Sequence, residues 1–379
     1  MTLKKIVAKL HLIIGLGIGL LFFIIALSGA IYTWAPEIGR ITYQQNIDSQ
    51  NLPFVPVSVL KATIAREFPE GDFRTTLYRD KNTTAEVLLY APGTYYIAQM
   101  NPYTGELVHL QDMNQGWLNY IKFIHRNLML GDIGREIVHW VTLLALPMLI
   151  TGLILWWPAK RKGSKKFFKI KWNASPKRLN YDLHNVLGFY ATWILIFTIL
   201  TGLFWGFEWV RETLKSSTGE SEKVYETPKS EVSSTKTATD QFVLMDSLMQ
   251  LYQRRFPDKN IRVSNPHQED EPIRVVIIDR DMMVYNVDHY YYDRYSGKQI
   301  MGDFQNGLYA QNSTFTTLNK LIYDIHLGTI FGFTGKVLVC LASLIAASLP
   351  ITGFLIWWGK QKKKYPAQPT GHRSLHQKK

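Results

Sequence analysis

The sequence predicts an α+β membrane protein, in which a bundle of four transmembrane helices carries two extramembrane α+β domains, built as a duplicated helix–domain–helix unit. Three observations predict this fold class. The 379-residue chain has four long stretches without charge, its basic residues gather in three segments, and four of its histidines fall into two matched pairs of motifs. Together these features indicate a chain that crosses a membrane four times and repeats its own pattern once.

The uncharged stretches define the transmembrane helices. No Asp, Glu, Lys or Arg occurs between Lys9 and Glu37, Glu136 and Lys160, Asp182 and Glu208, or Lys336 and Lys360. Each stretch covers roughly the 20 residues that a helix needs to cross the hydrocarbon core. We therefore expect four membrane-spanning helices.

The basic residues set the orientation. Residues 1–11, 159–181 and 359–379 hold nineteen Lys and Arg but no Asp or Glu. Cytoplasmic segments near transmembrane helices carry such an excess, so we expect these three segments and both termini in the cytoplasm. The formal net charge of +13 then reports topology and contact with the lipid bilayer, and it does not indicate binding to nucleic acid.

These limits divide the chain into nine predicted parts. They are a cytoplasmic N-terminus at 1–11, transmembrane helix 1 at 12–34, a first extramembrane domain at 35–136, transmembrane helix 2 at 137–158, a basic cytoplasmic connector at 159–181, transmembrane helix 3 at 182–207, a linker and second extramembrane domain at 208–336, transmembrane helix 4 at 337–358, and a basic cytoplasmic tail at 359–379.

Each extramembrane segment predicts a helix followed by strands. In both segments, apolar residues first recur at helical spacing, a proline follows, and apolar and polar residues then alternate. This pattern predicts helices at 57–68 and 242–256 and strands at 85–90, 95–100, 274–278 and 284–292. Two turns of similar chemistry, 101–106 and 293–298, place a glycine at the positive-φ position. We expect each segment to form a small domain with its own core, after a flexible linker at 216–239.

Four histidines follow the duplication. His11 and His184 each open a Leu-His-x-x-x-Gly motif, whereas His125 and His326 each open an Ile-His-x5-Gly-x2-Gly motif that ends in Arg or Lys. Each histidine is also followed by a glycine near the end of the next apolar stretch, and the separation repeats. It is 18 residues from His11 to Gly29 and from His184 to Gly202, and 27 residues from His125 to Gly152 and from His326 to Gly353. With the N-terminus inside, topology places His11 beside His184 and His125 beside His326, one pair in each leaflet.

Paired imidazoles at a membrane indicate a haem. Two axial histidines suit a b-type haem, and the chain has no Cys-x-x-Cys-His motif for covalent attachment. The sequence thus predicts two b haems, with His11, His184, His125 and His326 as axial ligands of the iron. Gly15 and Gly188 lie one turn beyond their histidines, where a larger side chain would collide with a porphyrin.

His139 is the alternative ligand on the second helix. It lies inside the uncharged stretch, where an ionisable residue is a functional candidate, and it could replace His125. Its equivalent in the second repeat is Cys340, which departs from the pattern. The remaining histidines are expected on solvated surfaces, namely His109, His267, His289, His372 and His376.

Other chemistries lack their motifs. One cysteine cannot form an internal disulfide or a Cys-x-x-Cys site, and the chain has no Gly-rich nucleotide loop, His-Glu-x-x-His or Gly-x-Ser-x-Gly. No cytoplasmic segment is long enough to bind a nicotinamide or flavin. The electron donor is therefore unknown, either a membrane quinol or a separate reductase.

The motifs together resemble the PepSY-associated transmembrane family, the iron-regulated or PiuB-like membrane proteins. The resemblance covers nearly the whole chain and rests on Leu-His-x-x-x-Gly, Asn-Pro-Tyr-Thr-Gly-Glu, Ile-His-Arg-Asn-Leu-x-x-Gly, Asp-Leu-His-Asn-x-x-Gly-Phe, and the helix ends Thr-Gly-Leu-x-x-Trp-Trp-Pro and Thr-Gly-Phe-x-x-Trp-Trp. It implies a multi-pass protein of the bacterial inner membrane with two periplasmic PepSY-like domains. It also implies a haem-dependent oxidoreductase that reduces ferric siderophores on the periplasmic side and releases Fe(II).

Two functions of different classes follow. In the first, electrons pass from the His11–His184 haem to the His125–His326 haem and then to a ferric siderophore or another periplasmic acceptor. In the second, the chain holds no haem, and its PepSY domains bind or regulate a periplasmic protein or peptidase. Only the first function explains why four histidines occur at equivalent positions of the two repeats.

Overall fold

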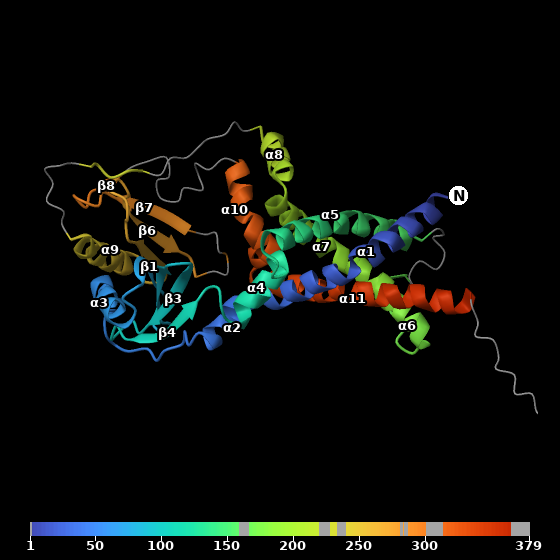
Figure 1. Cartoon of the computed structure of the whole chain (residues 1–379), viewed down its shortest axis with the longest axis horizontal. Helices are drawn as coiled ribbons and strands as arrows, with labels where there is room; N and C mark the ends of the chain where they lie inside the picture. Colours follow the sequence, from blue (N-terminus) through green and yellow to red (C-terminus); the bar gives the residue numbers. More distant parts are fainter. Residues whose placement is uncertain are drawn as a thin grey trace, which may run out of the picture.

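The chain folds into a long helical bundle with a strand-rich layer at one end (Figure 1). The computed structural model describes residues 2–158, 167–219, 228–232, 240–280, 283, 287–300 and 314–364. Most of the predicted linker at 216–239, and residues 365–379 of the predicted basic tail with His372 and His376, lie outside the described residues. The N-terminus lies at the end of the bundle opposite the strands (Figure 1).

Four helices form the bundle, and each is long and apolar enough to cross a membrane. They are α1 (Leu3–Tyr32), α5 (Gly131–Trp156), α7 (Gly188–Gly206) and α11 (Gly332–Lys364). Helices α1 and α7 each pack against both α5 and α11. Small buried side chains, including Ala145, Ala191 and Ala346, let the backbones approach closely at the centre.

Short helices extend the bundle at both ends. The shorter α-helices are α2 (Ala35–Thr42), α4 (Trp117–Asn127), α6 (Pro176–Asp182), α8 (Glu208–Ser217) and α10 (Thr314–Leu327). A π-helical turn at Leu183–Leu187 joins α6 to α7, and a 3₁₀ turn at Thr329–Phe331 precedes α11. Helix α1 begins at Leu3, so His11 lies inside it and not ahead of a helix that starts at residue 12.

The two extramembrane segments share one sheet, which differs from the expected pair of separate domains. The strands are β1 (Asp72–Tyr78), β2 (Ala85–Ala91), β3 (Thr94–Met100), β4 (Leu107–Asp112), β5 (Asn260–Ser264), β6 (Ile273–Ile278), β7 (Val287–Tyr292) and β8 (Gln299–Ile300). Their order is β4-β3-β2-β1-β5-β6-β7-β8, and all described pairs are antiparallel. Strand β1 pairs with β5, for example Thr76 with Val263, because each would otherwise be an unpaired edge.

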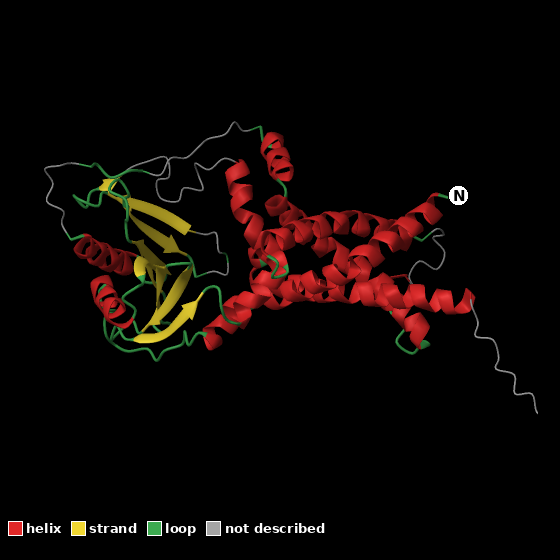
Figure 2. Ribbon diagram, viewed as in Figure 1, coloured by secondary structure: helices red, strands yellow, loops and turns green. Residues whose placement is uncertain are grey.

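The shared sheet also has a shared hydrophobic core. Helices α3 (Val57–Glu67) and α9 (Gln241–Arg255) pack on one face and contact each other. One continuous cluster of buried side chains contains Leu60 and Leu89 from the first segment together with Met245 and Val275 from the second. The opposite face of the sheet turns toward the transmembrane helices (Figure 2). The duplicated halves are therefore joined as one α+β layer.

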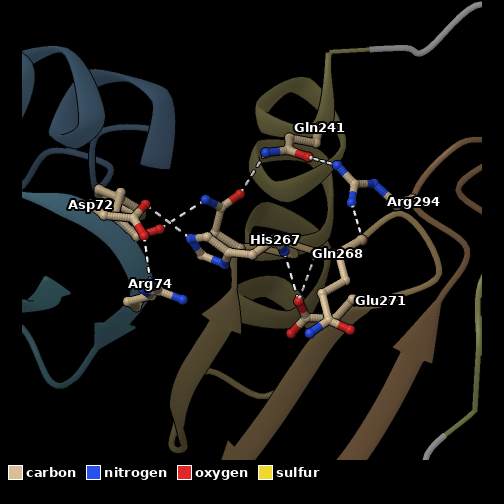
Figure 3. A network of polar contacts seen from close by, with 9 residues as sticks. Asp72, Arg74, Gln241, His267, Gln268, Glu271 and Arg294 are labelled. Carbon is tan, nitrogen blue, oxygen red and sulfur yellow. Dashed lines mark hydrogen bonds and ion pairs between the residues drawn. The ribbon is translucent and has the colours of Figure 1, made fainter. Parts of the chain in front are cut away.

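A network of polar contacts connects the first and second extramembrane segments beside the β1–β5 pairing (Figure 3). The Asp72 carboxylate in the first half accepts from Arg74 at 2.6 Å and contacts Nε2 of His267 in the second half at 3.0 Å. A second link joins the two covering helices, because the Ser58 hydroxyl donates to the Asp246 carboxylate at 2.5 Å. These contacts fix the relative position of the two segments.

The two predicted turns form as expected. Gly105 and Gly297 have φ of 76° and 66°, a region that L residues with a side chain rarely adopt. In each turn a side-chain oxygen at the first position, from Asn101 or Asp293, accepts backbone N–H groups two and three residues on. The turns are structural, and their repeated chemistry follows from their repeated shape.

The paired glycines after His125 and His326 form two sharp bends. Gly131 and Gly332 begin α5 and α11 with φ of 60° and 58°. A Cβ on Gly134 would lie 1.8 Å from the carbonyl oxygen of Asn127, and a Cβ on Gly335 would lie 2.1 Å from that of Gly328. Both glycines therefore let the end of a short helix press against the first turn of the next one.

We predict that Gly134→Ala destabilises the protein strongly. Overpacking against movable side chains costs about 1–3 kcal/mol, and here the obstacle is backbone, so the loss should be at least that large. The measurement is the thermal unfolding midpoint in detergent. The matched control is Gly17→Ala on α1, where an added Cβ meets nothing within 4 Å. Equal midpoints for the two variants would contradict this account of the bend.

Candidate functional site

The bundle brings the four histidines together in two pairs. At the end near the N-terminus, His11 of α1 faces His184 of the π-helical turn, with ring centroids 6.5 Å apart and ring planes at 89°. At the end near the sheet, His125 of α4 faces His326 of α10, with centroids 6.2 Å apart. Each pair takes one histidine from each half of the chain.

Three histidines are held by a threonine on a neighbouring helix. Nδ1 lies 2.9 Å from the Thr151 hydroxyl for His11, 2.9 Å from Thr352 for His184 and 2.8 Å from Thr201 for His326. Each threonine donates its hydroxyl hydrogen to the carbonyl four residues earlier in its own helix. Since that hydrogen is already committed, the hydroxyl accepts from the histidine, and Nδ1 carries the proton.

The fourth histidine is held by the backbone. Nδ1 of His125 lies 2.8 Å from the carbonyl oxygen of Ile25 in α1. Ser28, which takes the place of the threonine, donates its own hydroxyl to the Ile24 carbonyl at 2.7 Å. A carbonyl can only accept, so Nδ1–H of His125 donates and its Nε2 keeps a free lone pair. All four histidines are thus held in the same tautomer.

A glycine lies beside each histidine ring. An added Cβ would meet Cε1 of the ring at 3.5 Å for Gly152 and His11, 3.2 Å for Gly353 and His184, 3.9 Å for Gly202 and His326, and 2.7 Å for Gly29 and His125. These glycines directly follow Thr151, Thr352, Thr201 and Ser28. At three positions the hydroxyl that accepts from the histidine therefore directly precedes a glycine that leaves room for the ring, and at Gly29 the preceding residue is Ser28 instead.

A cavity of about 600 Å³ adjoins the His11–His184 pair. Its wall is mainly apolar, and four of the glycines that the sequence singled out line it, Gly15, Gly188, Gly152 and Gly353. The side chains of Lys9 and Lys360 also reach it. The volume falls within the range of about 300–1,000 Å³ that is typical of small-molecule and cofactor sites.

The two imidazoles of the pair near the sheet are partly buried. Burial lowers the pKa of the His326 imidazole to about 3, and the neighbouring His125 adds to this shift. Burial also lowers the pKa of His125. Both rings are therefore neutral at physiological pH, which is the form of histidine that binds a metal ion.

His139 does not join either pair. Its ring packs against Phe207 at 5.9 Å, and its Nδ1 is buried without a hydrogen-bond partner in the described chain. A Cβ on Gly206 would lie 2.9 Å from the ring, so His139 is fixed by close packing. Its repeat equivalent Cys340 contacts the Ala30 carbonyl instead, at 3.7 Å.

Two other histidines differ from the expected solvated surface. Nε2 of His109 and Nδ1 of His289 are both buried and without a hydrogen-bond partner among the described residues. His109 stacks on Tyr43, and His289 stacks on Tyr291 in β7. Successive side chains of a strand point to opposite faces of the sheet, and both of these histidines lie on the face that turns toward the transmembrane helices. They are therefore covered, although they belong to an extramembrane segment.

The donor set determines what the site can hold. Each pair offers two imidazole nitrogens, and no group of three or more metal-ligating side chains occurs in the described residues. Such a pair can complete the coordination only of a metal that brings its other ligands with it. The sequence analysis did not identify the three threonines that hold the histidines. Their signal was present, because a threonine directly precedes Gly152, Gly202 and Gly353.

The family follows from comparison with known proteins. The profile of the PepSY-associated TM region family matches residues 8–360. The chain belongs to this family. The matched range contains all four paired histidines and the residues that hold them, and no curated protein matches the chain significantly. Membership of the PepSY-associated TM region family agrees with the four membrane-spanning helices of the structure.

We predict that Thr352→Val lowers the stability of the protein even without any cofactor. The substitution keeps the shape but leaves Nδ1–H of His184 without an acceptor, which costs about 1–3 kcal/mol when the group is buried. Thermal unfolding of the cofactor-free protein measures the loss. Thr352→Ser, which keeps the hydroxyl, should recover most of it.

The control for this test is Ser348→Ala on the same helix. In the described part of the chain, the Ser348 hydroxyl donates to the Ile345 carbonyl at 2.7 Å and forms no hydrogen bond with a histidine. A loss in Ser348→Ala as large as in Thr352→Val would show that the helix, not the histidine contact, is responsible.

Proposed function

We propose that this protein is a di-haem b electron-transfer protein of the bacterial inner membrane that reduces ferric siderophores on the periplasmic side and so releases Fe(II) for uptake. The observation that carries the proposal is the hydrogen bond that holds Nδ1 of each paired histidine to a neighbouring helix, which we call its tether. It is present in His11, His184, His125 and His326. A ligating histidine usually donates its second N–H to a protein acceptor, which fixes the ring and raises the basicity of the coordinating nitrogen. Four such tethers in two facing pairs are difficult to explain for a chain without a metal.

The spacing of the pairs fits one iron between each two rings. A metal–imidazole nitrogen bond is about 2.0–2.1 Å, so two rings on opposite sides of one metal have centroids about 6 Å apart. The observed separations are 6.5 and 6.2 Å. A porphyrin supplies the four remaining ligands that the described side chains lack.

The residues near the N-terminus also fit a porphyrin. The cavity beside His11 and His184 is apolar except at a few positions, and glycines form part of its wall. Lys9 and Lys360 provide positive charge for the two propionates of a haem. Leu12, where this family often has Arg, also lines the cavity, so Lys9 and Lys360 are the basic residues of its lining in the described chain.

Each residue has a defined part in the proposed function. The four histidines hold the two irons, and the threonines and the Ile25 carbonyl hold the histidines. A bis-histidine haem supplies reversible one-electron transfer between Fe(III) and Fe(II). With the basic segments in the cytoplasm, the His125–His326 pair lies on the periplasmic side beside the sheet. The siderophore as acceptor is taken from the family resemblance, and the donor is a quinol or a separate reductase.

The direct test is haem stoichiometry. We predict about two b haems per chain in protein produced with ample haem, measured as the pyridine haemochrome of detergent-purified samples. Alanine at His11, His184, His125 or His326 should each remove or destabilise one haem, because one axial ligand and its tether are lost. His139→Ala is the matched control and should retain both.

Two results would overturn the proposal. Protein without haem would leave the haem-free module that binds or regulates a periplasmic partner as the better account. Loss of one haem in His139→Ala, together with retention of both in His125→Ala, would assign the ligand on the second helix to His139 instead.

A further inference from the structure

We propose that the sheet face turned toward the transmembrane helices binds an anionic ferric chelate through Arg262, Arg274 and Lys320. The inference rests on the proposed function, because it names the chemical class of the acceptor that the His125–His326 site would serve. The acceptor is a chelate whose coordinating groups leave a net negative charge, such as a carboxylate or catecholate complex of Fe(III).

Strand alternation places the first two cations on this face. In β5 and β6 the side chains of Ile261, Val263 and Val275 enter the core under α3 and α9. Their neighbours Arg262 and Arg274 therefore project from the opposite face. In β7 the same alternation puts His289 and Tyr291 there, and Arg274 pairs directly with Tyr291 across the strands.

Lys320 reaches the same place from the membrane side. It lies on α10 and, with Arg274 and Arg262, is close enough to His289 to disfavour its protonation. Burial is the main cause that lowers the pKa of His289 to about 4, and the three cations add to it. Charges from the sheet and from the bundle therefore converge on one buried imidazole.

Negative charge is scarce on this face. Glu86 is the acid nearest to Arg262, and it is already paired with Arg79 at 2.8 Å. The described positions of β5, β6 and β7 that share the face with Arg262 carry no Asp or Glu. Burial lowers the pKa of the half-buried Arg262 guanidinium, Glu86 partly opposes this shift, and Arg79 and Arg274 lower the pKa further. An anion would relieve this accumulation of positive charge.

The third observation is the distance to the redox site. On α10, Lys320, Tyr323 and His326 follow one another at three-residue spacing, so Tyr323 neighbours both other side chains and lies between them on the helix surface. Six residues of α-helix span about 9 Å, which brings Lys320 that close to the His326 backbone. Trp205 contacts the His326 ring at 5.1 Å and the Tyr323 ring at 6.1 Å. An anion held at Lys320 is thus within about two helical turns of His326, with Tyr323 and Trp205 between them.

The ligand chemistry follows from these groups. Two guanidiniums recognise carboxylate or catecholate oxygens in a bidentate manner, and an ammonium adds a third donor. A cationic chelate would be repelled by the same residues.

The test measures binding without electron transfer. Gallium(III) complexes replace iron complexes because gallium is not reduced, and isothermal titration calorimetry on the full-length protein in nanodiscs gives the affinity. We expect a trianionic gallium tris-catecholate to bind more tightly than the cationic gallium complex of desferrioxamine B. Arg274→Gln and Lys320→Gln should each weaken the anionic complex about tenfold to hundredfold, as loss of a charge-assisted contact does.

The matched control is Arg254→Gln on α9, an exposed arginine on the helix that covers the other face of the sheet. It should leave the affinity unchanged. Arg274 is exposed, so its substitution does not depend on repacking of a core, whereas Arg262→Gln serves as a third variant if it remains folded. Equal affinity for the two gallium complexes, or equal effects of Arg274→Gln and Arg254→Gln, would overturn the inference.

Haem content of the same samples separates this inference from the proposed function. Protein with two haems but no preference for the anionic complex would overturn the anionic acceptor alone. Protein without haem that still prefers the anionic complex through Arg274 and Lys320 would overturn the electron-transfer function and leave an anion-binding face.

Discussion

The hydrogen bond from Nδ1 of each paired histidine to a neighbouring helix is the constraint on which the rest of the structure depends. His11 is tied to α5 and His125 to α1, both within the first half of the chain, whereas His184 is tied to α11 and His326 to α7 in the second half. Each half is thus fastened internally at both ends. The facing rings meet only across the boundary between the halves, so whatever binds between them also joins the halves.

The tethers also explain the glycines. A threonine that accepts from a histidine brings the ring against the next residue of its helix, and the short distances from Gly29 and Gly353 to the rings leave little room there for a side chain. The two ends of the bundle are not identical, however. Both histidines near the N-terminus are held by threonine hydroxyls, while His125 near the sheet is held by a backbone carbonyl. The tautomer is the same, but the strength of the acceptor differs.

The sheet makes the second connection between the halves. Pairing of β1 with β5 removes two strand edges, and the common core under α3 and α9 prevents the two segments from moving apart. It follows that one end of the bundle carries a single layer, in which the half-buried Arg262 lies on the sheet face turned toward the transmembrane helices. A pair of independent domains would not fix such a relation.

The sequence predicted the four spans, the pairing of the histidines and the turns at Gly105 and Gly297, because each depends on local chemistry or on the repeat. It did not predict the joint sheet. Alternation of apolar residues reports which side chains face a core, but it does not report which strand lies next to β1. The Thr201 and Thr352 acceptors were also missed, since a threonine in a transmembrane helix usually bonds only to its own backbone. Likewise, His289 was expected at the surface because nothing in its strand showed that a second layer lies above it.

The most direct measurement is the electron paramagnetic resonance spectrum of the oxidised, haem-loaded wild-type protein. If two tethered imidazoles ligate each iron, both ferric haems must be six-coordinate and low-spin, and the spectrum should contain low-spin signals only. A substantial high-spin ferric signal, which indicates an iron with a single strong axial ligand, would contradict the paired-histidine account.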